Sequence, residues 1–336
     1  MENIKLFNTL GFIPSEDKIH RNNFLPATLH CLTNMKFLND LILYFDGSTE
    51  KNKLLNTYKN LLQKIQKAKK EKAISIEDFE KILFESDDYK EDKEKRNPKY
   101  LFHNLLQNFH NFYSTQYKNT TIFDKITVEF QTTLSCPECH KEIEEKKNGE
   151  KYLIYDICKE YCNKNGNKDY NIYDCLRSYL KNEKEIINKK CTNCKKETKQ
   201  KAKKIYKTLP DVLIIQVDYG KDKNFKLDKG IKFKENLDFS EINNIDVEEK
   251  YKNKKYYLSS LICVREILDP KKEYFYTFCG VKNDNNDKNK YWCYNEEKVH
   301  EVININNKIE KEKINLDNKK QRFPYILIYT VLEQKI

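Results

Sequence analysis

Two short stretches decide how this chain folds: C-P-E-C at residues 136–139 and C-T-N-C at residues 191–194. Each is a C-x-x-C step, and two such steps supply four thiolates, the ligand count of a closed tetrahedral zinc site. About fifty residues separate the steps, which is too long for one compact finger. The spacing instead predicts two hairpin tips, distant in the sequence, that a metal ion ties together.

The residues that follow the two steps favour the same interpretation. His140 and Lys141 follow the first step, Lys195 and Lys196 follow the second, and nearby positive charge favours thiolates over thiols. Two alternatives stay open at this point, namely four unrelated reduced cysteines and a disulfide pair. We predict a structural Zn2+ site with these ligands: Cys136, Cys139, Cys191 and Cys194.

The composition is that of a folded but polar protein. Of its 336 residues, 34% are charged and 38% hydrophobic, and aromatic residues at 12% supply much of the apolar bulk. This aromatic content argues against a disordered chain. The net charge of +11 points toward nucleic acid, but the charge is mostly lysine interleaved with glutamate. Lysine lacks the bidentate fork of arginine, so we expect no nucleic acid as the main partner. The basic run at residues 195–204 is interpreted as solvated surface, with contact to an acidic protein as the alternative.

The cysteine count and the start of the chain indicate a compartment. Eleven cysteines, an odd number, fit a reducing compartment better than a disulfide scaffold. Residues 1–5 begin no long apolar run, so no signal peptide is expected. No stretch reaches the roughly twenty apolar residues of a membrane span. We expect an intracellular protein of the nucleus or cytoplasm, without a membrane partner.

Cys158 and Cys162, spaced i, i+4, could join a metal site.

The order of the predicted elements indicates an α+β class. Apolar residues recur with the helical period of 3.6 in the first 120 residues and follow strand patterns after that point. The expected helices cover residues 24–32, 37–45, 54–65, 75–83, 98–112 and 173–180. The expected strands cover residues 126–130, 152–157, 212–217, 257–264, 274–279, 291–294 and 325–331. The strand at 212–217 is rich in β-branched residues, as central strands are.

Several stretches resemble, in order and spacing, the motifs of the ubiquitin-specific proteases. L-H-C-L at residues 29–32 sits like the L-Q-C-L that follows the nucleophile, and residues 97–106 sit like the Q-D-A-x-E-F-L box. Residues 206–218 resemble I-x-x-L-P-x-x-L-I-I-x-L-K-R, residues 291–299 resemble W-x-x-F-D-D-x-x-V, and residues 324–329 resemble A-Y-I-L-F-Y. The two C-x-x-C steps sit like the zinc ribbon of that family. The likeness covers nearly the whole chain.

This resemblance implies a papain-like cysteine-protease fold of the ubiquitin-specific protease type. Such a fold has a helical thumb, an antiparallel β palm, and β fingers that carry a zinc ribbon. Residues 1–336 would form one domain of this kind. The thumb would cover residues 20–120, the fingers would be inserted in the palm at residues 121–206, and the β-rich palm would cover residues 207–336.

The catalytic positions of the family are where this sequence departs from it. Counting back from L-H-C-L places the nucleophilic cysteine at Asn23, whose amide cannot attack an isopeptide carbonyl as a thiolate can. In the histidine box G-H-Y-x-A-Y, Glu273 stands at the histidine, with Tyr274 there if the register slips by one. The residue that orients the imidazole falls on Asn295, which then has nothing to orient. The resemblance therefore implies a degenerate triad.

The favoured function is a catalytically inactive protein of this type that is not an enzyme. It would bind ubiquitin or a ubiquitinated protein, or act as an assembly scaffold among the subunits of a protein complex. Residues 19–26 also run close to the degenerate box of an inactive subgroup that serves assembly of the splicing tri-snRNP. Membership of that subgroup would make the partners spliceosomal.

Two other functions stay open. The first is an active ubiquitin carboxyl-terminal hydrolase, a thiol-dependent deubiquitinase that uses Cys31 beside His30. Cys31 lies in a helical apolar stripe, however, where cysteine is usually a small buried hydrophobe. The second is a structural subunit that has lost ubiquitin binding. The sequence does not give the partner complex or the oligomeric state.

Overall fold

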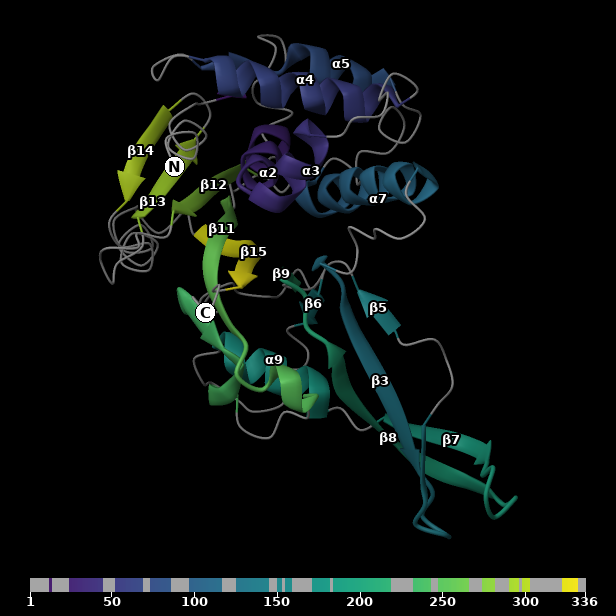
Figure 1. Cartoon of the computed structure of the whole chain (residues 1–336). Helices are drawn as coiled ribbons and strands as arrows, with labels where there is room; N and C mark the ends of the chain where they lie inside the picture. The colour runs from purple at the N-terminus through teal and green to yellow at the C-terminus, as the bar shows by residue number, and fades with distance from the viewer. Residues whose placement is uncertain are drawn as a thin grey trace. The chain divides into compact units, whose positions relative to one another are not determined.

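Figure 1 shows the computed structural model of the chain. The structure describes residues 12–13, 24–44, 52–68, 73–85, 97–116, 125–144, 150–152, 155–158, 171–181, 184–218, 232–242, 247–265, 274–281, 290–295, 298–302 and 322–331. The chain divides into two compact units, the first formed by Met1–Ile122 with Ser259–Ile328 and the second by Phe123–Leu258 with Tyr329–Ile336. The division falls within strands β11 (Lys255–Arg265) and β15 (Arg322–Val331), so each of these strands contributes to both units.

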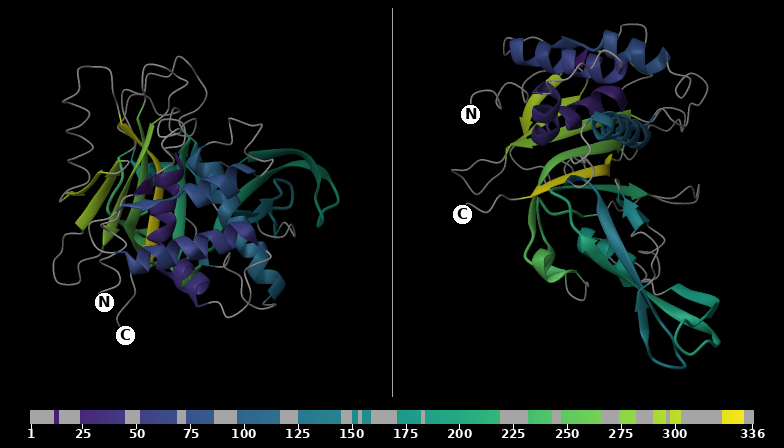
Figure 2. Two further views of the ribbon diagram at one scale, coloured as in Figure 1. Left: turned by 90° about the horizontal axis from the view of Figure 1, so that it is seen from above. Right: turned by 45° about the vertical axis from the view of Figure 1, so that its right-hand side comes forward.

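Two of the described helices of the first unit, α4 and α7, begin at a capping asparagine. They are α2 (Phe24–Thr33), α3 (Lys36–Leu43), α4 (Lys53–Lys67), α5 (Glu77–Glu85) and α7 (Pro98–Gln116). Asn52 caps α4, because its side chain accepts a hydrogen bond from the Leu55 N–H at 3.0 Å. Asn97 caps α7 in the same way through the Tyr100 N–H at 2.9 Å. Helices α4 and α5 lie side by side in Figures 1 and 2.

Helix α2 is the centre of the first unit, and all ten of its residues are buried. A helix buried on every side lies inside a core, and the hydroxyls of its Thr28 and Thr33 are satisfied by carbonyls of the same helix. Its packing against a neighbouring strand, β12 (Tyr274–Val281), is fixed by two side chains of that strand. The Thr277 hydroxyl donates to the Ala27 carbonyl at 2.9 Å, and the Cys279 thiol donates to the His30 carbonyl at 3.5 Å. Each fully buried leucine of α2 stabilises the fold by roughly 1.5–3 kcal/mol.

Antiparallel strands form the sheet that α2 packs on. Within the first unit the strand order is β14-β13-β12-β11. These strands are β11 (Lys255–Arg265), β12 (Tyr274–Val281), β13 (Lys290–Asn295) and β14 (Lys298–Val302), with β15 at Arg322–Val331. The register pairs Cys263 with Tyr276 and Cys279 with Trp292. A separate short pair, β1 (Phe12–Ile13) and β2 (Ile74–Ser75), is parallel.

The second unit carries an antiparallel sheet that reaches the two cysteine steps. Its strand order is β4-β3-β8-β7, with β5 also paired to β3. The strands are β3 (Val128–Ser135), β4 (Glu142–Glu144), β5 (Glu150–Tyr152), β7 (Lys184–Lys190) and β8 (Glu197–Thr208). The turn between β3 and β4 holds the first C-x-x-C step, and the turn between β7 and β8 holds the second. The sheet thus presents both steps at the ends of hairpins.

The remainder of the second unit packs around aromatic side chains. Its elements are β6 (Tyr155–Cys158), α9 (Ile172–Lys181), β9 (Val212–Asp218), β10 (Asn236–Asp238) and two short 3-10 helices at Phe239–Glu241 and Glu249–Tyr251. The Tyr206 ring lies 4.8 Å from that of Phe130 and 5.7 Å from that of Phe239, measured between centroids. Tyr256 continues the cluster at 5.8 Å from Phe239, and its hydroxyl donates to the Pro210 carbonyl. Tyrosine supplies this core with bulk and with a satisfied polar end.

Three features differ from the sequence-based expectations. The helix expected through residue 45 ends at Leu43, where the Tyr44 N–H bonds back to the Asp40 carbonyl. The single strand expected at residues 152–157 is two strands, because β5 pairs antiparallel with β3 whereas β6 pairs parallel with β9. The antiparallel sheet region expected in the palm therefore includes one parallel pair. The strands at β7 and β14 had no sequence-based prediction, and the proposed thumb, finger and palm boundaries stay predictions.

Candidate functional sites

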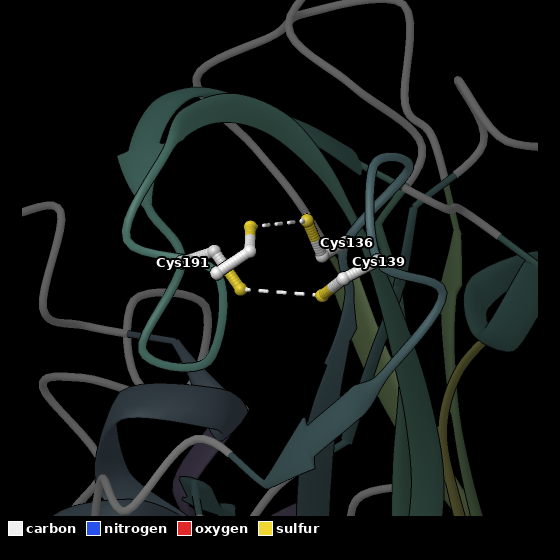
Figure 3. A group of neighbouring side chains, drawn as sticks. Cys136, Cys139 and Cys191 are labelled. Carbon is white, nitrogen blue, oxygen red and sulfur yellow. Dashed lines mark hydrogen bonds between the residues drawn. The ribbon is translucent and has the colours of Figure 1, made fainter.

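The four cysteines of the two C-x-x-C steps gather in the second unit. Their Sγ atoms all lie within 4.8 Å of one another, and Figure 3 shows three of these residues labelled. The Sγ of Cys136 lies 3.8 Å from that of Cys194, and the Sγ of Cys139 lies 3.7 Å from that of Cys191. Each close pair therefore joins one step to the other. The prediction that two distant hairpin tips meet at these cysteines is confirmed.

Each step forms a tight turn, and the two turns share one backbone pattern. The His140 N–H donates to the Cys136 carbonyl at 2.9 Å, and the Lys195 N–H donates to the Cys191 carbonyl at 3.0 Å. The N–H of the first cysteine donates onward to the carbonyl five residues later, at 3.2 Å in the first turn and 2.8 Å in the second. These bonds direct the cysteines of each step toward the other step.

The last residue of each turn adopts a left-handed conformation. His140 has φ of 54° and Lys195 has φ of 60°, although neither is glycine. This conformation costs a residue with a Cβ atom roughly 1–2 kcal/mol. The same departure in both turns shows that the two C-x-x-C steps share one turn geometry, which includes a left-handed residue directly after the second cysteine.

The surroundings of the cysteines favour the thiolate form in the first step. The Thr198 hydroxyl lies 3.6 Å from the Sγ of Cys136, and this hydrogen bond lowers the pKa of Cys136 to about 6. A backbone hydrogen bond from Lys141 lowers the pKa of Cys139 as well. Thiolates are the form of cysteine that binds metal ions, so these two shifts suit a metal ligand. In the second step a backbone hydrogen bond from Lys196 lowers the pKa of Cys194, but burial and the three other cysteines outweigh it and raise that pKa to about 11.

One ion pair bridges the two turns. The Lys196 ammonium lies 3.1 Å from the Glu138 carboxylate, and both side chains are at least half exposed. An exposed pair of this kind contributes little to stability. Its position places a positive charge beside the cysteine cluster, and the pKa of Lys196 is raised chiefly by its hydrogen bond to Glu138.

The sulfur positions fit a metal ion. A tetrahedral site with metal–sulfur bonds of about 2.3 Å places its sulfurs about 3.8 Å apart, as the two close pairs are. The same distances are too long for a disulfide bond, whose sulfurs are about 2 Å apart, so none of these four cysteines forms a disulfide with another. The two alternatives of unrelated cysteines and a disulfide pair are therefore wrong for this group. The four cysteines can bind a metal ion. Cys162 and the side chain of Cys158 lie outside the described residues.

The positions of the degenerate triad lie at the edge of what the structure describes. Asn23 and Glu273 are outside the described residues, and each directly precedes a described element, α2 and β12 respectively. These two elements run in the same direction, because Thr277 bonds to the Ala27 carbonyl whereas Cys279, further along β12, bonds to the His30 carbonyl, further along α2. Asn295 is the last residue of β13, the strand paired with β12, and its side chain is also outside the described residues. The assignment of all three positions remains a prediction.

Cys31 is not placed to act as a nucleophile. Its side chain is fully buried and in hydrogen-bonding contact with Cys279, Ser260 and Thr277. Burial raises the pKa of the Cys31 thiol well above its ordinary value, which keeps the sulfur protonated. The interpretation of Cys31 as a small core side chain is therefore supported by its environment.

The neighbouring His30 is equally enclosed. Its ring stacks on that of Phe12, with centroids 4.2 Å apart, and burial lowers its pKa to about 3. A histidine held neutral in this way cannot accept a proton from a neighbouring thiol near neutral pH. Among the cysteines whose side chains the structure describes, those outside the cluster are all buried. The idea of an active cysteine peptidase built on Cys31 and His30 is thus contradicted by their placement.

Sequence reasoning missed Thr198 and the ion pair between Lys196 and Glu138. Thr198 is 62 positions from Cys136, and nothing in the strand E-T-K-Q-K marks one threonine as a partner of a distant sulfur. The alternation of exposed and buried residues along β8 could have indicated only that its side chain points inward.

The fold is that of a ubiquitin-specific protease catalytic domain, with mixed helices and antiparallel sheets. The chain belongs to the ubiquitin carboxyl-terminal hydrolase family, because the sequence model of that family matches residues 19–329. No curated protein sequence matches the chain. Among the described residues, no helix is both long and apolar enough to cross a membrane.

Two solved structures illustrate the likeness in fold. One is the yeast SAGA DUB module with a mutant Sgf73, at 14% sequence identity and a TM-score of 0.67, covering 99% of this chain and 70% of that chain. The other is the SAGA DUB module of Ubp8, Sgf11, Sus1 and Sgf73 bound to monoubiquitin, at 15% identity and a TM-score of 0.67, covering 98% and 70%.

Proposed function

We propose that this chain is a catalytically inactive member of its family that binds ubiquitin or ubiquitinated protein as part of a complex. One contrast carries the proposal. The chain keeps the four cysteines that can hold a metal, whereas Asn23 and Glu273 stand where the family resemblance puts its thiol and imidazole. Without a thiolate and a base, no acyl transfer can begin on an isopeptide carbonyl. The enclosed state of Cys31 and His30 supports the same conclusion, because neither can take over.

The role proposed for the metal is structural, and the metal proposed is Zn2+. Four sulfur ligands with tetrahedral spacing suit Zn2+ and leave no open position for a substrate or water. Cys136, Cys139, Cys191 and Cys194 would hold it. Bound there, the ion would supply no chemistry to a reaction and would tie the β3–β4 turn to the β7–β8 turn.

The proposed partners follow from the family and from the fold. A solved structure of similar fold is a SAGA DUB module bound to monoubiquitin, with further subunits around it. We propose that this chain likewise meets ubiquitin and other subunits, in the nucleus or the cytoplasm. The short likeness to the splicing-associated subgroup makes a spliceosomal complex one candidate assembly. Purification of the tagged chain from its native cells, followed by mass spectrometry, tests the complex: co-purifying tri-snRNP proteins would support the spliceosomal candidate, and their absence would remove it.

Loss of activity is tested with the zinc-loaded full chain and a fluorogenic ubiquitin-amide substrate. We expect no turnover above the rate without protein, and no labelling by a ubiquitin probe that traps an active-site thiol. An active deubiquitinase serves as the positive control. Reproducible turnover, whether or not Cys31→Ser abolishes it, would show the proposal to be wrong.

Ubiquitin binding is tested separately, because a scaffold without it is the second candidate. Titration of isotope-labelled ubiquitin with the full chain is expected to shift a contiguous set of ubiquitin amide signals. If no signal moves at the highest soluble concentration, the chain is a structural subunit that has lost ubiquitin binding.

A further inference from the structure

The two cysteine turns are equivalent in backbone but differ in one neighbouring side chain. The strand that leaves each turn begins six residues after the first cysteine of the step, at Glu142 for β4 and at Glu197 for β8. The second residue of that strand is Ile143 after the first turn and Thr198 after the second. A polar side chain therefore stands in β8 at the position where β4 has an apolar one.

Thr198 reaches across to the cysteine of the other turn. The Oγ1 of Thr198 lies 3.6 Å from the Sγ of Cys136, which lies in the turn between β3 and β4. Thr198 is only 9% exposed. Cys136 itself is 1% exposed. A hydroxyl can turn its hydrogen toward a sulfur, so Thr198 is the donor when the sulfur is a thiolate.

Thr198 is held at this place by the sheet. It pairs with Lys189 of β7, and the next inward residue of β8, Gln200, donates from its Nε2 to the Lys189 carbonyl at 3.2 Å. Lys199 between them is exposed, so the strand alternates in the way that fixes the Thr198 side chain on the inner face. A side chain fixed in this way can orient a ligand without an entropic penalty at the moment of binding.

We propose that Thr198 is a positioning residue of the metal centre, holding the Cys136 sulfur in place through a hydroxyl-to-thiolate hydrogen bond and so increasing retention of the metal ion. The proposal rests on the zinc site of the proposed function. Four thiolates around Zn2+ carry excess negative charge, and a donated hydrogen bond offsets part of it. The hydrogen bond also orients one of the two most enclosed ligands, whose release would require the turn to open.

The test uses three variants of the full chain. Thr198→Val removes the hydroxyl and keeps the shape of the side chain, whereas Thr198→Ser keeps the hydroxyl and removes a methyl group. Thr192→Val makes the same hydroxyl-to-methyl change at an exposed threonine inside the second step and serves as the matched control. Zinc affinity is measured by competition with a chromophoric chelator, and Co2+ substituted for Zn2+ reports the cobalt–thiolate charge-transfer absorption.

We expect Thr198→Val to bind zinc about 10-fold more weakly, the size typical of an outer hydrogen bond to a metal ligand, and to shift the charge-transfer band. Thr198→Ser and Thr192→Val should keep both the affinity and the band of the unaltered chain. Unchanged affinity in Thr198→Val, or an equal loss in Thr198→Ser, would overturn the proposal, because the second result assigns the effect to methyl packing.

The outcomes separate this inference from the proposed zinc site. If the unaltered chain binds no zinc, both are wrong. If it binds one zinc ion and Thr198→Val binds with equal affinity, only the role of Thr198 is wrong. Circular dichroism of the zinc-saturated variants shows whether Thr198→Val keeps its fold, and the cobalt spectrum still reports on the sulfur if folding is weakened.

Discussion

Cysteine has opposite roles in the two units of this protein. In the second unit, four cysteines converge from two hairpins, two of them stay partly exposed, and hydrogen bonds favour the thiolate in the first step. In the first unit, Cys31 lies within α2, fully buried, and its pKa is raised. The presence of a cysteine therefore does not by itself show whether its sulfur can bind a metal ion. Burial alone does not separate the two roles, because Cys136 and Cys191 are as buried as Cys31; what differs is that the cluster brings four sulfurs together.

The two regions also differ in what has been kept relative to the family. The two cysteine turns of the second unit hold all four cysteines, and each turn ends in a residue with positive φ. The region around α2 and β12 keeps the packing of a helix on a sheet, whereas Asn23 and Glu273 stand at the predicted nucleophile and base. The packing of α2 on β12 and the cysteine cluster depend on other atoms than the predicted triad positions do.

Removing ligands from the cluster should give the largest effect. In the Cys136→Ser/Cys191→Ser variant we expect loss of the bound metal, because a structural zinc site contributes about 10–16 kcal/mol of apparent binding energy through its full ligand set. Elemental analysis should find one zinc per unaltered chain and none per variant chain.

The matched control for this variant is Cys175→Ser in α9, a buried cysteine of the same unit outside the cluster. It should keep one zinc per chain. If the double variant kept its zinc, or if Cys175→Ser lost it, the assignment of ligand and packing cysteines would be wrong.

Acid should destabilise the first unit through His30. Its pKa is about 3 in the folded chain against 6.5 as the ordinary value, so the unfolded chain binds a proton that the folded chain does not. Stability is therefore lost as the pH falls below 6.5, by about 2 kcal/mol at pH 5. His30→Phe keeps the stacking on Phe12 without titrating and should lose about 2 kcal/mol less between pH 7 and pH 5. Urea unfolding followed by the fluorescence of Trp292, the single tryptophan, measures this difference. An identical loss in both proteins would show that His30 is not enclosed.

Cys31→Ser should have a moderate effect on stability and none on catalysis. The serine hydroxyl can bond to the same neighbours as the thiol, Ser260 and Thr277, so we expect a loss of about 1–2 kcal/mol in the free energy of unfolding. Ubiquitin-amide turnover should stay at the background rate. Alkylation of the native chain, followed by mass spectrometry, should leave Cys31 unmodified, whereas chelation should expose Cys139 and Cys194. Rapid modification of Cys31 in the native chain would contradict its assignment as a core residue.

The exposed ion pair between the turns should have the smallest effect. Glu138→Gln removes the partner of Lys196, and we expect a loss of about 0.5 kcal/mol or less, because both side chains are largely solvated. Thermal unfolding of the zinc-loaded chain at low and high salt measures it. A loss larger than that of Cys31→Ser would mean that the pair acts on the metal centre and is not merely a surface contact.

Local patterns in the sequence were enough to identify the four cysteines that can bind a metal ion and the outline of the fold. The two C-x-x-C steps identify these cysteines because the spacing within each step is a local property of the chain. The apolar periods that predict α4 and β9 are local as well. The prediction of a degenerate triad is also a sequence result, since it depends on which residues stand at Asn23 and Glu273.

The neighbours of Cys136, Cys31 and His30 could be identified only from the folded structure. The contact between Thr198 and Cys136 joins positions 62 residues apart, and the parallel pairing of β6 with β9 depends on a choice among strands that no local pattern makes. The enclosure of Cys31 and His30 likewise requires β12 and Phe12 to be brought against α2. The physical reason is that burial, and with it the pKa of a thiol or an imidazole, is set by neighbours in space that local sequence patterns do not identify.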